Sequence, residues 1–138
     1  MSAGKAIYSL LSASTTLAGL VSTRIYPGIA PFDTAYPHII FTTIDDVPHQ
    51  CMGSTFGMRE SGVQVDVYAA DPQLTVLHNI LDRVETILHN YSGSTSGVDV
   101  ATILLENEQP DLVEDIGTTS AANYVRRGTQ DYTVWYRE

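Results

Sequence analysis

The segment from Ser61 to Leu88 changes its hydrophobic period abruptly, and this change constrains the fold more than any other feature. Up to Ala70 the residues alternate, with one face formed by Val63, Val65, Val67 and Ala69 and the other by Gln64, Asp66 and Tyr68. Such alternation predicts a half-buried strand. Beyond it, apolar residues recur at three- and four-residue steps, namely Leu74, Leu77, Leu81, Val84 and Leu88. That spacing predicts a helix whose apolar stripe covers a sheet.

Capping signals mark both ends of this helix. Asp71 can accept hydrogen bonds from the free N–H groups of the first turn, and Pro72 fits the first helical position, where an N–H is not needed. Gly93 is placed to end the helix in a left-handed conformation. We therefore expect a long helix followed by a flexible turn over residues 92–97.

Weaker patterns predict the other elements. A short amphipathic helix is expected over residues 3–13 and a second apolar turn over 17–21, while the prolines at 27, 31 and 37 exclude a helix from the connection that follows. Strands are expected over 38–45, 98–106 and 124–136. There is no internal repeat. We predict one α+β domain over residues 1–138, a mainly antiparallel sheet with the long helix and the short N-terminal helix packed on one face.

Residues 46–62 differ from their surroundings. Proline and glycine recur among polar residues, and single large apolar residues stand between them, namely Met52, Phe56 and Met58. Connections longer than about 12 residues are usually functional or disordered. This segment is therefore either an extended hairpin arm or a loop that orders only against a partner. We predict an interface there, formed by Met52, Phe56, Met58 and Arg59 together with Trp135 of the last strand.

The charge balance excludes one broad class of function. The formal net charge is −9, so a groove that grips nucleic-acid phosphates is not expected. Residues 106–115 hold five acids and no base, and these are Glu106, Glu108, Asp111, Glu114 and Asp115. They could line a channel and repel DNA, or they could form a solvated outer loop.

The single cysteine, Cys51, cannot form an internal disulfide, which favours folding in a reducing compartment. The N-terminal residues lack the continuous apolar run of a signal peptide or a membrane span. We expect a chain made in the cytoplasm without a membrane partner.

Catalytic and metal-binding patterns are weak. Asp45, Asp46, His49 and Cys51 lie close together, but no second pair of cysteines or histidines completes a zinc site. His78 and His89 are about three helical turns apart, too far to share an ion. No nucleophile elbow or phosphate-binding glycine loop is present in the sequence. We predict neither catalysis nor a cofactor.

The order of several short segments resembles a known family. These segments are Leu17–Val21, Arg24–Pro27, Tyr36–Ile40, Val63–Ala69 before the long helix, and Asp131–Val134. In order and spacing they are similar to the tail completion, or tail terminator, proteins of long-tailed bacteriophages and gene transfer agents.

The resemblance implies an α+β subunit of a hexameric ring at the neck of the virion, assembled in the host cytoplasm. Such a ring stops growth of the tail tube, and its partners are other copies of the subunit, the tail tube protein and a head-completion or stopper protein. An acidic chain suits a ring through which DNA passes without being bound. Sheet edges and extended loops are well suited to form the head-to-tail contacts that close a ring.

Two other interpretations remain open. Within the same class, the chain is a head–tail connector or stopper subunit. From another class, it is a small hydrolytic or ligand-binding α+β domain whose site is the cluster from Asp45 to Cys51.

Overall fold

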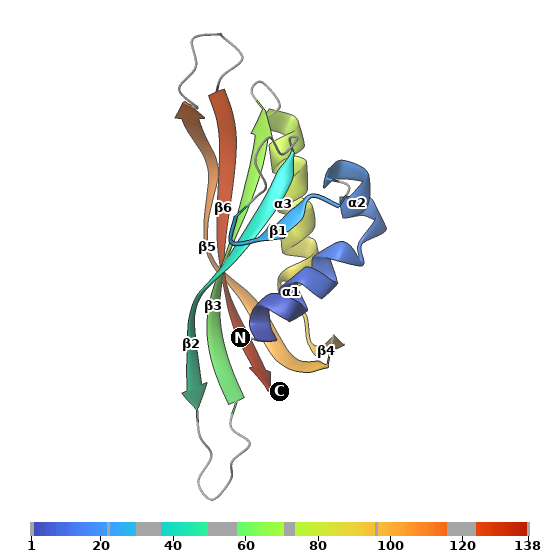
Figure 1. Cartoon of the computed structure of the whole chain (residues 1–138), viewed down its shortest axis with the longest axis vertical. Helices are drawn as coiled ribbons and strands as arrows, with labels where there is room; N and C mark the ends of the chain where they lie inside the picture. The colour runs from blue at the N-terminus through green and yellow to red at the C-terminus, as the bar shows by residue number, and fades with distance from the viewer. Residues whose placement is uncertain are drawn as a thin grey trace, which may run out of the picture.

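The computed structural model describes residues 2–21, 23–29, 37–49, 58–70, 74–95, 97–115 and 124–137. Its helices are α1 (Ser2–Ser12), α2 (Thr15–Val21) and α3 (Leu74–Leu88). Its strands are β1 (Ile25–Pro27), β2 (His38–His49), β3 (Met58–Ala70), β4 (Gly93–Thr95), β5 (Val98–Asp115) and β6 (Tyr124–Arg137). The α+β class expected from the sequence is confirmed (Figure 1).

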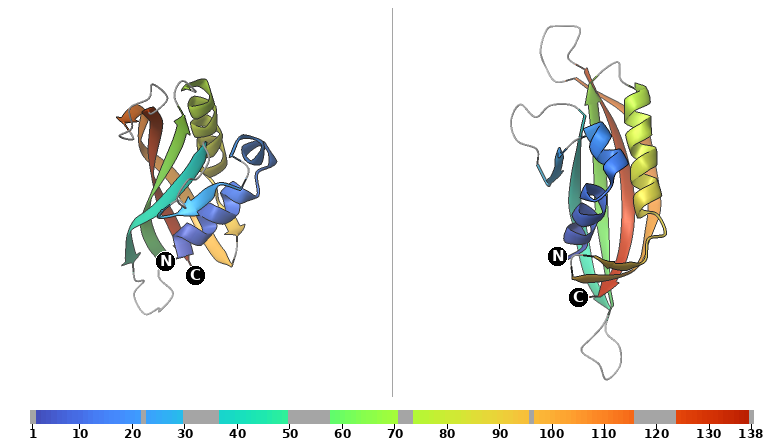
Figure 2. Two further views of the ribbon diagram at one scale, coloured as in Figure 1. Left: turned by 45° about the horizontal axis from the view of Figure 1, so that its top comes forward. Right: turned by 90° about the vertical axis from the view of Figure 1, so that its right-hand side faces the viewer.

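The strands form one sheet in the order β1-β2-β3-β6-β5-β4. The short β1 pairs with β2 in parallel over Ile25–Pro27, and the other four neighbouring pairs are antiparallel. The last strand, β6, lies between β3 and β5. Figure 2 shows the curled sheet with α1 and α3 on one of its faces, while β2 and β3 extend past the helices at one end of the sheet.

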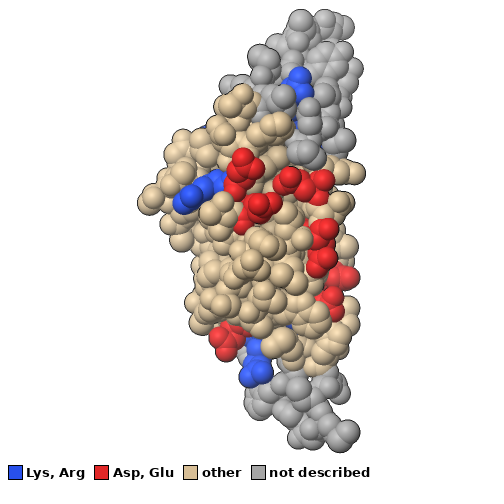
Figure 3. Space-filling model, turned by 180° about the vertical axis from the view of Figure 1, so that it is seen from behind, with Lys and Arg blue, Asp and Glu red and all other residues tan. Residues whose placement is uncertain are grey.

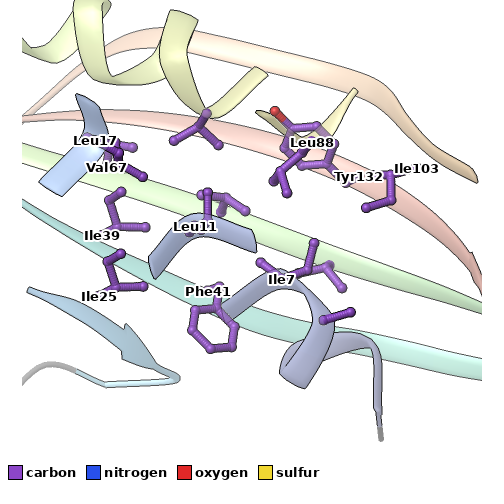
Figure 4. Packing of buried hydrophobic residues seen from close by; sticks show 14 of the residues in the cluster. Ile7, Leu11, Leu17, Ile25, Ile39, Phe41, Val67, Leu88, Ile103 and Tyr132 are labelled. Atoms are coloured by element: carbon purple, nitrogen blue, oxygen red, sulfur yellow. The ribbon is translucent and has the colours of Figure 1, made fainter. Parts of the chain in front are cut away.

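The core lies between that face and the helices. The predicted strand face is confirmed, because Val63, Val65, Val67 and Ala69 are all buried. The helical stripe of α3 meets them through Leu77, Leu81, Val84 and Leu88. Ile7 and Leu11 of α1, Leu17 of α2 and Tyr132 of β6 complete the packing seen in Figure 4. The predicted cap, Asp71 and Pro72, and the side chain of Leu74 lie outside the described residues.

The end of α3 differs from the sequence-based expectation. Asn90, with φ of 65°, adopts the left-handed conformation that was expected at Gly93. The N–H of Asn90 donates to the carbonyl of Ile103 at 2.7 Å, so a contact with β5 holds the turn in place. Asparagine tolerates this conformation because its short side chain can bond locally. Gly93 instead belongs to β4, where residues 93–95 pair with 98–100 of β5.

Two segments expected to be irregular are strands. At the ends of the 46–62 segment, residues 46–49 continue β2 and 58–62 continue β3, as in the extended-arm alternative. The acidic run is not an outer loop, because its backbone continues β5 as far as Asp115, which is paired with Tyr124. The predicted strands over 38–45 and 98–106 are therefore too short. The backbone N–H and C=O groups of these polar segments form hydrogen bonds with neighbouring strands. The local composition of the sequence does not reveal such pairing.

Candidate assembly surfaces

The end of β2 and the start of β3 form an arm, defined here as residues 45–49 and 58–62. At its base, Arg59 Nη1 lies 3.1 Å from Asp46 Oδ2, and the Tyr136 hydroxyl donates to Asp46 Oδ1 at 2.9 Å. Burial acts to raise the pKa of Asp46, but hydrogen bonds to its carboxylate, including the one from Tyr136, and nearby positive charge, including that of Arg59, outweigh it and lower that pKa. The Tyr136 contact joins the arm to β6, and the Arg59 contact joins the two strands of the arm to each other.

A β-bulge between Thr43 and Asp45 bends β2 where the arm begins. Across it, the N–H of Gly62 donates to Asp45 Oδ1 and the hydroxyl of Ser61 donates to the Asp45 carbonyl, both at 2.7 Å. A Cβ on residue 62 would lie 2.9 Å from Asp45 Oδ1, so a side chain there would require the Asp45 carboxylate to shift. The bulge leaves Ile44 at 60% exposure.

His49 on the arm contacts two residues. Its Nε2 lies 3.0 Å from Glu60 Oε2, and its ring centroid lies 5.2 Å from that of the half-buried Trp135. Asp45, Asp46 and His49 thus have partners within the protein. Cys51 lies outside the described residues, which contain no group of three or more potential ligands arranged to hold a metal ion. The Asp45–Cys51 cluster therefore gains no support as a chemical site.

A polar network lies beneath α3. Gln130 is fully buried, and its Nε2 donates to the carbonyl of Leu81 and to Glu108 Oε2. Its Oε1 accepts from the Tyr132 hydroxyl at 2.7 Å. Burial, followed by the charges of Glu85 and Glu108, raises the pKa of Tyr132 far above its usual range. Glu108 thus has a structural partner on the helix-covered face.

The opposite face of the sheet carries an ion pair that the sequence-based reasoning did not single out. Asp66 is buried, and its Oδ1 accepts from Thr129 at 2.8 Å and from Arg127 Nη2 at 3.2 Å. The Arg127 guanidinium also lies over the Tyr68 ring, 5.8 Å from the centroid. The only sequence signal for this ion pair was Asp66, a carboxylate between valines of a predicted strand. Its partner, Arg127, is 61 residues away in the sequence.

A groove of about 940 Å³ opens beside the first helix, between α1, β1 and β2. Tyr8, Ile25 and Phe41 form apolar parts of its wall, and the rings of Tyr8 and Phe41 are 6.2 Å apart. Of the described residues that line it, Lys5 alone is charged.

Acidic side chains gather on the other flank of the molecule. Figure 3 shows them in a band on this face. The acids of α3 and β5 whose side chains are described are Asp82, Glu85, Asp99, Glu106 and Glu108.

The predicted site residues are distributed as follows. Met58 and Arg59 begin β3, where Arg59 is paired with Tyr136 and Glu60 with Trp135, so Met58, Arg59 and Trp135 lie near one another at the arm. Met52 and Phe56 are outside the described residues.

Glu106 and Glu108 are exposed on β5. Asp111, Glu114 and Asp115 belong to the same strand, and their side chains are outside the described part. The interface and channel roles of all these residues stay predictions.

Comparisons with known proteins define the class first. The fold matches a chain of a solved structure, "Virion of native gene transfer agent (GTA) particle", with a TM-score of 0.70, 15% sequence identity, and coverage of 97% of this chain and 93% of that chain. The model of the family "Tail completion protein gp17" matches residues 5–137. The chain therefore belongs to the tail completion protein gp17 family and is a structural, tail-related protein of a virion. No match was found among curated protein sequences.

No helix in the described part of the chain is long and apolar enough to span a membrane.

Proposed function

We propose that this chain is the tail terminator subunit, which forms a ring on the end of the tail tube and joins it to the head-completion proteins. The family match over residues 5–137 carries this proposal. The expected ring is hexameric, its role is structural rather than enzymatic, and its partners are further copies, the tail tube protein and a head-completion or stopper protein.

The shape and surface of the subunit support an assembly role. At one end of the sheet β2 and β3 extend past the helices (Figure 1), so strand surface remains available there to neighbours. An overall charge of −9 disfavours retention of DNA by phosphate contacts, as passage of DNA through a ring requires.

Native mass spectrometry of the purified protein, alone and with tail tube protein, tests the proposal. We expect a six-fold oligomer that binds tube ends and stops their elongation. A protein that binds head-completion protein but leaves tube length unchanged would favour a connector or stopper role. A compact monomer without affinity for either partner would contradict both roles.

The predicted channel role of the acidic run has a separate test. Glu106, Asp111, Glu114 and Asp115 are replaced by lysine, and Glu108 is kept because it binds Gln130. If these acids line the channel, virions that carry the mutant ring should eject DNA more slowly, and added salt should weaken the effect. Normal ejection from virions shown to contain the mutant ring would exclude the channel role.

A further inference from the structure

We propose that the hollow between α2 and α3 binds a carboxylate group through Arg83, and that this carboxylate belongs to an acidic side chain of a partner protein. The hollow, here called the α2–α3 hollow, has a volume of about 560 Å³ and lies where α2 packs beside α3 (Figure 1). Its lining includes Thr16 and Gly19 of α2 and Asn79, Asp82, Arg83 and Thr86 of α3.

Arg83 is a half-buried base without a partner among the described residues. Its Nε is sealed from solvent and donates to no acceptor there. Three other half-buried arginines, Arg24, Arg59 and Arg127, each donate to an acceptor within the subunit. A sealed N–H without an acceptor is costly in free energy, so folded proteins retain few of them. Arg83 is therefore an exception that needs an explanation.

The sequence around Arg83 supplies no acid that can pair with it along the helix. Side chains three or four residues apart meet on a helix surface. The residues at these distances are Asn79, Ile80, Thr86 and Ile87. Asp82 and Glu85 are one and two residues away, and side chains at such spacings do not face each other. The neighbouring helix α2 carries no charged residue, so the charge of Arg83 is not neutralised from that side.

Two further donors line the same hollow. The hydroxyl of Thr16 and the amide of Asn79 come from different helices, and neither has a hydrogen-bond partner within the described part of the chain. A guanidinium binds a carboxylate through two parallel hydrogen bonds, and the remaining lone pairs of the carboxylate can accept from other donors. The arrangement therefore suits an anion with two oxygen acceptors.

Asp82 restricts the charge of that anion. It lies between the α2–α3 hollow and a smaller hollow that it lines with His78, Leu81 and Glu108. Its negative charge opposes any anion beside Arg83, and the repulsion is larger for a phosphate group with nearly two charges than for a carboxylate with one. This difference favours a carboxylate as the ligand.

The openness of the hollow favours a side chain of a protein over a free carboxylate. Thr16, Gly19, Asn79 and Thr86 are all exposed, and a Cβ on Gly19 would meet nothing within 4 Å. Sites that hold small molecules enclose most of the ligand surface, which this open hollow does not do. An acidic side chain presented by a protein surface gains the additional contacts of that surface.

The competing explanation is that the stem of Arg83 only covers apolar surface while its charged end reaches water. An arginine in that role keeps its donors solvated, whereas Nε of Arg83 is sealed. A carboxylate reaches Nε only when the guanidinium turns toward the open part of the hollow. Binding should therefore change the environment of this N–H directly.

Nitrogen-15 NMR of the full chain tests the site through the Nε–Hε signal of Arg83, which is identified by its loss in Arg83→Lys. The probe is N-acetyl-glutamate α-amide, whose single carboxylate is on its side chain. N-acetyl-glutamine α-amide is the matched neutral control. We expect a saturable shift with the first compound and none with the second. Equal responses to both, or no response, would overturn the site.

Three variants separate binding from a structural role, with the backbone amide of Gly19 as the NMR reporter. Arg83→Met keeps the stem and should abolish probe binding without lowering the thermal midpoint measured by circular dichroism. Asp82→Asn removes the repulsion and should tighten binding about two- to fivefold. Arg137→Gln changes an exposed base of β6 and is the control. Unchanged probe affinity in Arg83→Met or in Asp82→Asn would contradict the assignment.

Sedimentation over a concentration series identifies the source of the carboxylate. Wild type and Arg83→Met are compared alone, with tail tube protein and with head-completion protein. Weakening of one association about fivefold or more by Arg83→Met supports the proposal and names the partner, a second copy included. If the probe binds but every association is unchanged, the ligand is a free carboxylate only, and the docking role is overturned.

The outcomes also separate this site from the proposed function. Wild-type rings that cap tail tubes, together with an Arg83 signal that ignores the probe, would reject the site and leave the terminator role standing. Wild-type protein that neither self-associates nor binds either partner would reject the terminator role and the protein source of the carboxylate. The NMR titration still decides the carboxylate site in that case.

Discussion

Gly128 shows how tightly α3 packs on the sheet. A Cβ at this position would overlap the side chain of Leu81, which is itself buried against β6. The absence of a side chain at one residue of β6 therefore sets the distance between helix and sheet. Well-packed interiors accept extra atoms only by moving their neighbours.

We predict that Gly128→Ala lowers the free energy of unfolding by about 1–3 kcal/mol, because the added methyl group overpacks this contact. Urea denaturation monitored by circular dichroism measures the effect. Gly19→Ala is the matched control, since its Cβ would meet nothing within 4 Å and alanine favours the helix. Equal midpoints for Gly128→Ala and the wild type would show that Leu81 can move away at little cost.

Tyr132 gives a pH prediction at the same scale. Its pKa is raised in the folded protein, so the folded chain keeps the phenolic proton at pH values where the unfolded chain loses it. The contribution of Tyr132 to stability is therefore complete below a pH of about 10 and declines as the pH rises above that value. The slope for this one group is about 1.4 kcal/mol per pH unit.

Tyr132→Phe should reduce this alkaline loss and should also cost about 1 kcal/mol at neutral pH, because Gln130 loses the hydroxyl donor. Urea denaturation at several pH values between neutral and about 11 compares the two proteins. Parallel curves for the variant and the wild type would mean that Tyr132 titrates normally in the folded state.

At the scale of the elements, the arm is the feature most exposed to change. It extends beyond the helices (Figure 2), so the contacts across the bulge replace the core packing that holds the rest of the sheet. Asp45 takes part in two of these contacts, one through its carboxylate and one through its carbonyl.

Removal of the carboxylate tests the role of the bulge. We expect Asp45→Ala to cost about 1 kcal/mol and to speed hydrogen exchange at Gly62 and its neighbours in β3. Asp99→Ala removes an exposed acid from β5 and should leave exchange in the arm unchanged. If exchange at Gly62 stays the same in both variants, the strand pairing alone maintains the arm.

For the whole molecule, the last strand is central although it ends the sequence. Strand β6 pairs with β3 and β5 along most of its length, and it buries Tyr132, Val134 and Tyr136. The sheet has no continuous path from β3 to β5 without it.

We predict that deletion of residues 131–138 abolishes soluble, folded protein. Deletion of residues 137–138 alone serves as the control, because it spares the buried tyrosines. Soluble yield and far-ultraviolet circular dichroism compare the two proteins with the full chain. A soluble protein with unchanged spectrum after the longer deletion would refute the central role of β6.

The hydrophobic periodicity of the local sequence was sufficient to predict the elements that face the core. Alternation predicted the buried face of β3, three- and four-residue steps predicted α3, and the aromatic alternation near the C-terminus predicted β6. In each case one face of the element is buried, so apolar residues recur in the sequence at a fixed interval. This interval differs between strand and helix. The α+β class follows from the same hydrophobic periodicities.

The tertiary structure alone decided the features that depend on partners far along the chain. The arm and the acidic end of β5 are strands because a neighbouring strand bonds their backbones, and Asn90 ends α3 because Ile103 accepts its N–H. Glu108 reaches Gln130 only after the register shift between Leu105 and Asn107. Periodicity reports which side chains are buried, whereas hydrogen-bond partners and strand register arise from chain segments brought together by folding.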